Sequence, residues 1–95
     1  MLPREERVGA IRAAITAGLA PTALDVRDDS HMHAGHEGAK DGRGHFSVDV
    51  VSDAFAGLGR VARHRAVYAA VGELMATDIH ALAIRARTPA EAGQG

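Results

Sequence analysis

Residues 45–52 read H-F-S-V-D-V-V-S, and this stretch decides the fold of the chain. Apolar side chains at its even-numbered positions alternate with polar side chains over most of its length, a period of two that is typical of a β-strand with one buried face. Residues 22–27 repeat the alternation over a shorter stretch. The two stretches therefore predict a pair of strands that associate as an antiparallel hairpin.

The connection between these strands is unusually long and rich in histidine. Residues 28–46 read D-D-S-H-M-H-A-G-H-E-G-A-K-D-G-R-G-H-F and carry four of the six histidines. The connection contains several glycines, and Met32 is its one large apolar side chain before Phe46. Burying so little apolar surface cannot offset the entropy lost when the connection becomes ordered. Its side chains are therefore expected to be displayed, and long loops in compact domains are often functional.

A helix is predicted before the hairpin. Val8, Ile11 and Ile15 recur at helical spacing, and Gly18 and Pro21 then stop the helix. The spacing places one apolar stripe on this helix, which predicts that it packs against the sheet.

A second helix and a last strand are predicted after the hairpin. A short turn through Phe55 leads into a helix over residues 60–75, and a strand follows over residues 79–87. Strict alternation in this strand places His80 on the same face as Leu82 and Ile84, at the edge of the core. The buried stripe expected for the helix comprises Val61, Val67 or Tyr68, Val71 and Leu74.

The order of these elements predicts the fold class. Helix, strand, strand, helix, strand corresponds to an α+β domain, αββαβ, in which helices cover one face of a three-stranded mixed sheet. The length of 95 residues suits one domain over residues 1–95. Residues 89–95 are small and polar and are expected to form a frayed tail.

The composition excludes several classes of function. Without cysteine the chain has no thiolate, so a metal must be held by histidine and carboxylate or by groups from a partner. A net charge of −1 excludes nucleic-acid binding by bulk electrostatics, although a local basic patch is still possible. No apolar run is long enough for a membrane span and the N-terminus lacks a signal sequence, which predicts a cytoplasmic protein without membrane contact.

The histidines allow a metal-binding and a structural interpretation. His31, His33 and His36 could bind a metal or could be ordinary polar residues of a solvated loop, since their spacing is not a known motif. A lone histidine such as His80 on an apolar face is by default hydrogen-bonded to the backbone. His45 opens a strand on the solvent side and is expected to be structural or neutral.

A basic cluster opens the second helix. Arg60, Arg63 and Arg65 could form a solvated face, a nucleic-acid contact or a docking surface for a protein partner. His64 lies between two of these arginines, and we expect it to have a structural role rather than to bind a metal. Positive charge is unfavourable at the N-terminal end of a helix dipole, so we expect an anionic partner or a nearby carboxylate to compensate it. Since no nucleophile–base pair or phosphate-cradling loop is present, we expect a binding or carrier protein and no enzyme.

Four strings of residues resemble the BolA family in order and spacing. They are V-R-D-D-S-H-M-H-A-G-H, G-H-F-S-V-D-V-V-S-D-A-F-A-G-L, V-A-R-H-R-A-V-Y and I-H-A-L-A-I-R-A-R-T-P. The resemblance implies a fold similar to class II KH domains, with a helix-turn-helix-like segment at about residues 54–75. The segment F-A-G-L-G-R stands where RNA-binding KH domains have a G-x-x-G loop, so RNA binding in the KH manner is not expected.

The resemblance also implies partners and ligands. BolA-like proteins pair with monothiol glutaredoxins and share a [2Fe-2S] cluster with the glutaredoxin cysteine and a bound glutathione, so this chain is expected to hold no cofactor alone and to be a monomer or a heterodimer. The histidine of the family motif falls on His80, and the loop ligand falls on His33, flanked by His31 and His36. Some bacterial members are described as transcriptional regulators of stress and morphology, with DNA contacts in the helix-turn-helix-like segment.

The chemistry suits histidine ligands. Replacing two thiolates by neutral imidazoles reduces the negative charge around a cluster and raises its potential, as in Rieske centres. The alternative function, DNA-binding regulation, would act through Arg60, Arg63, His64 and Arg65, residues that are also candidates for glutaredoxin docking.

Overall fold

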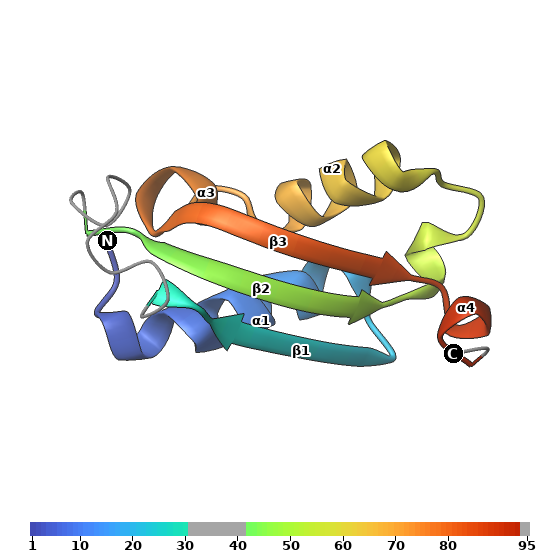
Figure 1. Cartoon of the computed structure of the whole chain (residues 1–95), viewed down its shortest axis with the longest axis horizontal. Helices are drawn as coiled ribbons and strands as arrows, with labels where there is room; N and C mark the ends of the chain where they lie inside the picture. Colours follow the sequence, from blue (N-terminus) through green and yellow to red (C-terminus); the bar gives the residue numbers. More distant parts are fainter. Residues whose placement is uncertain (31–41, 94–95) are drawn as a thin grey trace.

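A three-stranded mixed sheet, covered by helices on one face, forms the framework of the protein (Figure 1). The computed structural model describes residues 1–30 and 42–93. Strand β1 (Ala23–Asp28) pairs antiparallel with β2 (Gly44–Val51), and β2 pairs parallel with β3 (Ile79–Arg87). The sheet has the order β1-β2-β3, which confirms the α+β class and the mixed sheet.

The main helices, α1 (Arg7–Leu19) and α2 (Arg60–Val71), lie against the same face of the sheet (Figure 1). The remaining described helices are short: the 3-10 turns η1 (Arg4–Glu6) and η4 (Asp53–Phe55), and the α-helices α3 (Leu74–Thr77) and α4 (Pro89–Gly93). They join or terminate the larger elements and leave the other face of the sheet open.

Two of the predicted boundaries are wrong. The helix predicted over residues 60–75 ends at Val71, because Gly72 adopts a φ of 56° that a helix cannot continue. Residues 89–93 of the predicted frayed tail form α4, whose Glu91 is tied to α2 by Arg63.

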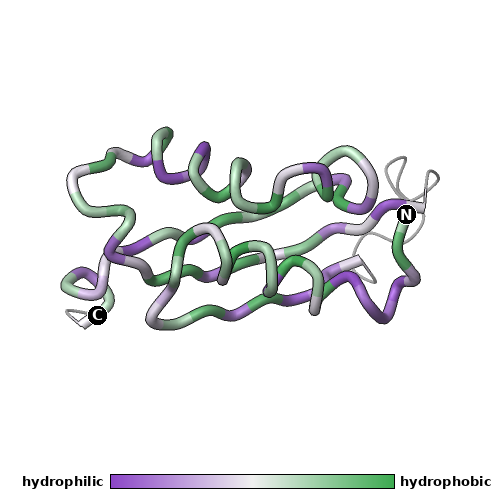
Figure 2. The backbone as a smooth tube through the Cα atoms, turned by 180° about the vertical axis from the view of Figure 1, so that it is seen from behind, coloured by the Kyte–Doolittle hydropathy of each residue, from purple (hydrophilic) through white to green (hydrophobic). Residues whose placement is uncertain are grey.

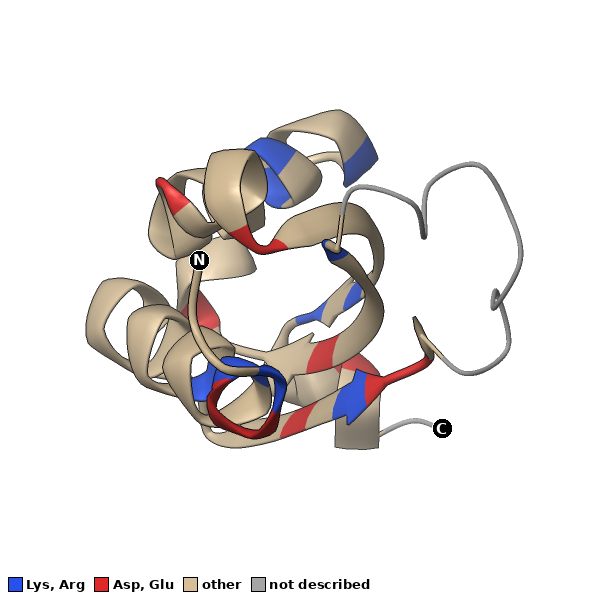
Figure 3. Ribbon diagram, turned by 90° about the vertical axis from the view of Figure 1, so that its left-hand side faces the viewer, with Lys and Arg blue, Asp and Glu red and all other residues tan. Residues whose placement is uncertain are grey.

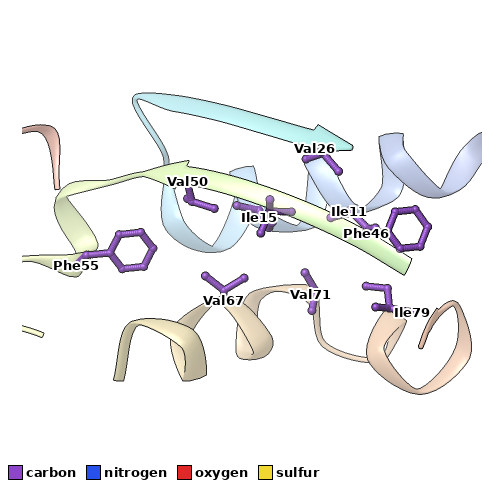
Figure 4. Packing of buried hydrophobic residues seen from close by; sticks show 10 residues of the cluster. Ile11, Ile15, Val26, Phe46, Val50, Phe55, Val67, Val71 and Ile79 are labelled. Carbon is purple, nitrogen blue, oxygen red and sulfur yellow. The ribbon is translucent and has the colours of Figure 1, made fainter. Parts of the chain in front are cut away.

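The core lies between the helices and the covered face of the sheet. Ile11 and Ile15 from α1 and Val67 and Val71 from α2 point toward the strands (Figure 4). Full burial of each aliphatic or aromatic side chain stabilises the fold by about 1.5–3 kcal/mol. The predicted stripe on the second helix is wrong at Val61, which is 64% exposed. The sheet and η4 contribute Val26, Phe46, Val48, Val50, Phe55 and Ile79.

An irregularity in the pairing of β2 with β3 changes which way His80 faces. Gly44 pairs with Ile79, but the next residue, His45, pairs with Ala81, so β3 carries one additional residue, His80. Such bulges re-aim side chains and recur beside functional sites. Ile79 is fully buried and His80 is exposed, so the prediction that His80 shares the core-facing side of β3 is wrong.

The open face of the sheet carries charges of both signs (Figure 3). Asp49 lies within 3.6 Å of Arg85 Nη1 and 3.2 Å of Arg87 Nη2, and Asp25 lies 3.7 Å from Arg27 Nε. These partly exposed pairs contribute little stability and keep this face hydrated.

Hydrophilic and hydrophobic residues are interspersed along the described backbone (Figure 2). Among the residues described, no helix is both long enough and apolar enough to cross a lipid bilayer.

Candidate functional site

His80 is displayed at the surface by the bulge at the start of β3. Its side chain is exposed, and Arg43 Nη2 lies 3.3 Å from His80 Nδ1. Because a guanidinium can only donate, this contact is a hydrogen bond only in the neutral tautomer that carries its proton on Nε2. A neutral imidazole is the form of histidine that binds a metal.

His45 is a second imidazole beside His80, and the sequence did not predict this proximity. The ring centroids lie 5.2 Å apart with the ring planes tilted by 50°. His45 is half-buried at the start of β2, where parallel pairing brings the beginnings of β2 and β3 side by side. Its position on the solvent side of the strand was predicted, but its neighbour depends on a pairing between strands that are distant in the sequence.

The end of β1 is fixed against His45 by hydrogen bonds. The His45 N–H donates to Ser30 Oγ at 3.1 Å, and the Asp29 N–H donates to the His45 carbonyl at 2.8 Å. The Ser30 N–H donates to Asp28 Oδ1 at 2.8 Å, and the Ser47 hydroxyl donates to the Asp29 carboxylate. The backbone N–H and carbonyl of His45 are therefore both bound by residues at the end of β1.

A buried ion pair fixes the start of β3. Arg7 Nε donates to Asp78 Oδ2 at 3.1 Å, with side-chain exposures of 5% and 2%. The same carboxylate accepts hydrogen bonds from the Leu2 N–H at 2.7 Å and from the Thr77 hydroxyl at 2.6 Å. Burial alone raises the pKa of the Asp78 carboxyl, but the hydrogen bonds from Thr77, Leu2 and Arg7 outweigh it, so the pKa lies below its ordinary value.

The loop histidines His31, His33 and His36 lie outside the described residues. In the ranges 1–30 and 42–93, no group of three or more histidine, cysteine or carboxylate side chains could hold a metal ion. The site therefore offers an exposed imidazole with a second imidazole next to it. Such a donor set fits a metal group that takes its remaining ligands from another molecule.

The basic cluster on α2 lies at the opposite end of the molecule. Arg60 and Arg65 are exposed, whereas Arg63 is bound by Glu91 at 2.6 Å and donates to the carbonyls of Leu58 and Ala86. The hydrogen bonds from Arg63 and from the Thr88 N–H lower the pKa of Glu91 to about 2. The carboxylate that the sequence suggested as a neighbour of these arginines is therefore Glu91.

His64 lines a shallow cavity beside this cluster. The cavity has a volume of about 250 Å³ and is lined by Leu58, Gly59, Arg60, Arg63, His64, Ala86 and Glu91. Arg63 donates to the carbonyl of Ala86 near the end of β3. Ala86 lies six residues after His80, which corresponds to about 20 Å along an extended strand. The two candidate surfaces are therefore spatially separate.

Comparison with known proteins identifies the family. The family model described as "BolA-like protein" matches residues 15–91. BolA-like protein 1 of Pongo abelii is 45% identical over 85 residues, covering 90% of this chain and 60% of that protein. The chain therefore spans about three fifths of the length of that relative.

A bacterial relative and a solved structure agree with this match. The DNA-binding transcriptional regulator BolA of Vibrio cholerae is 45% identical over 71 residues, covering 75% of this chain and 64% of that protein. The solved BolA domain of SufE1 from Arabidopsis thaliana superposes with a TM-score of 0.79 at 40% identity, covering 96% of this chain and 99% of that domain. The resemblance seen in the sequence motifs is confirmed, and the chain belongs to the BolA-like family.

Proposed function

We propose that this protein partners a monothiol glutaredoxin and supplies imidazole ligands to a shared [2Fe-2S] cluster, in cluster assembly, transfer or sensing. The observation that carries the proposal is the display of His80 on a bulge, 5.2 Å between ring centroids from His45. The resemblance of the I-H-A-L segment to the family motif supports the ligand role of the same residue.

The donor chemistry of the chain supports a shared cluster. With no cysteine it can offer imidazoles but no thiolates, so the thiolates must come from glutaredoxin and glutathione. Protonation of an imidazole removes the lone pair that binds iron, which would make the shared cluster sensitive to acid. Donating ligands to a cluster requires no catalytic step, and we propose that the protein has no enzymatic activity.

The second ligand from this chain is assigned by the family resemblance to His33, with His31 and His36 beside it. His45 is the other candidate, because it is the imidazole next to His80 in the described structure. We retain His33 as the proposed ligand and treat His45 as the alternative that the same experiment separates.

Anaerobic reconstitution with a monothiol glutaredoxin and glutathione tests the proposal. Visible absorption and circular dichroism should give a mixed-complex spectrum that differs from glutaredoxin alone and changes in His80→Ala and in His33→Ala. A change in His45→Ala in place of His33→Ala would assign the second ligand to His45. Arg87→Lys is the control, because Arg87 lies at the other end of β3, where it pairs with Asp49. A spectrum identical to that of glutaredoxin alone would refute the proposal.

DNA binding is the second candidate function. It is supported by the exposed Arg60 and Arg65 on α2 and by the name of the Vibrio cholerae relative, a DNA-binding transcriptional regulator. If it holds, fluorescence anisotropy should show an affinity for duplex DNA that falls steeply with salt. Arg60→Gln or Arg65→Gln should reduce the slope of log affinity against log salt concentration by about 0.9 for each phosphate that the arginine no longer neutralises. His80→Ala should leave this affinity unchanged, and a salt-independent affinity would refute a role for these arginines.

A further inference from the structure

We propose that Arg7 is a positioning residue that sets the placement of His80 relative to His45. The proposal rests on the proposed function of His80 as a ligand, and it adds a residue of the first helix to the site. The hydrogen bonds of Arg7 go to Asp78 and Gly42, so it acts through the backbone segments that carry the two imidazoles.

Arg7 binds two segments that are far from it in the sequence. Its Nε donates to Asp78 Oδ2 at 3.1 Å, and its Nη2 donates to the Gly42 carbonyl at 2.8 Å. Asp78 lies two residues before His80, and Gly42 lies three residues before His45. One guanidinium therefore joins the approaches to both histidines.

A backbone hydrogen bond closes this connection into a ring. The Gly44 N–H donates to the Asp78 carbonyl at 2.9 Å, directly beside the bulge. From Arg7 the connection thus runs to Gly42, along the chain to Gly44, across to Asp78 and back to Arg7. A closed ring of directional bonds fixes the relative position of two strands more tightly than apolar contacts alone.

Stability alone does not explain why a charged pair occupies this place. Replacing a buried ion pair by apolar side chains of similar volume is often neutral or stabilising. A guanidinium instead offers donors in a fixed planar arrangement, which suits it to hold two acceptors at once. Ligand sites need their geometry held within about 0.5 Å, and outer residues that provide it commonly matter about 10- to 100-fold for metal affinity.

Arg7→Lys is the discriminating variant, because lysine keeps the charge for Asp78 but lacks the rigid planar arrangement that serves both acceptors. The double variant Arg7→Met/Asp78→Leu removes the pair without leaving a buried charge. Arg87→Lys is the matched control, since Arg87 donates to both carboxylate oxygens of Asp49 at the other end of β3 and has no proposed binding role.

Two measurements are made on each folded variant. In the protein alone, NMR should show shifted imidazole signals of His80 and His45, a weakened contact between their rings, and shifted amides of Gly44 and Ala81 in both Arg7 variants. In the complex with glutaredoxin and glutathione, cluster affinity should fall about 10- to 100-fold in the Arg7 variants and stay within about twofold in Arg87→Lys.

The two measurements separate this proposal from the proposed function. Unchanged imidazole signals and ring contact in both Arg7 variants would overturn the positioning role, whatever the cluster does. If those signals shift but His80→Ala binds the cluster as the unmodified protein does, the proposed ligand role fails while the placement of the histidines by Arg7 is supported.

Discussion

Replacing Asp78 by asparagine should destabilise the protein more than any comparable change of a surface carboxylate. The carboxylate is 2% exposed and its partner Arg7 is 5% exposed, so the substitution leaves a guanidinium buried without a counter-charge. Breaking a buried pair by removing one member costs about 3–5 kcal/mol in the free energy of unfolding. For a chain of this length, with a total stability of roughly 5–14 kcal/mol, the substitution should remove between about a fifth and all of it.

Urea unfolding at pH 7, followed by circular dichroism, measures this change. A loss of about 3 kcal/mol also lowers the melting temperature by at least about 12 °C in a domain of this size. The control is Asp49→Asn, which breaks pairs whose carboxylate is 30% exposed, and it should cost below about 1 kcal/mol. A loss below about 1 kcal/mol in Asp78→Asn would refute the reasoning that this pair is buried and mutually dependent.

The pH dependence of Asp78 follows from the same contacts. Its folded pKa lies below the ordinary value of 3.8, so the charged carboxylate contributes stability above that pH. This contribution is lost as the pH falls through the lowered pKa, because the unfolded state takes up the proton first. The difference in stability between the unmodified protein and Asp78→Asn should therefore shrink below pH 3.8.

Three further outcomes are expected. Gly44→Ala should cost about 1–3 kcal/mol in urea unfolding, because its Cβ would lie 2.7 Å from Phe46 Cε2; an unchanged midpoint would contradict this close packing. Phe55→Ala should cost about 3–5 kcal/mol, since Phe55 is fully buried, and a loss under about 1 kcal/mol would show that it is not. For Glu91, whose pKa falls from 4.5 to about 2, the stability advantage over Glu91→Gln should be present above pH 4.5 and vanish toward pH 2; an advantage that persists at pH 2 would argue against its ion pair.

The sequence predicted those parts of the fold that depend on local patterns. Alternation over residues 45–52 identified β2, and the helical spacing of Ile11 and Ile15 identified the buried side of α1. The predicted end of α2 was wrong because the prediction did not end the helix at Gly72. The ability of glycine to adopt positive φ is a local signal for such an end.

The sequence could not predict the features that depend on strand register. Residues 79–87 continue their alternation through His80, so nothing in the pattern marks the bulge that turns this side chain outward. The proximity of His45 to His80 requires the parallel pairing of β2 with β3, and the Arg7–Asp78 pair joins residues 71 positions apart. These contacts are set by tertiary packing, and they are the ones that build the candidate site.

Pulsed electron paramagnetic resonance on the reduced mixed cluster tests the central claim most directly. The protein is labelled with ¹⁵N-histidine and combined with unlabelled glutaredoxin and glutathione, so that nitrogen couplings from this chain can be recognised. We predict a strong coupling to histidine nitrogen that is lost in His80→Ala and retained in the Arg87→Lys control. The same coupling in His80→Ala, or none in the unmodified complex, would contradict the claim that His80 is a ligand to the cluster.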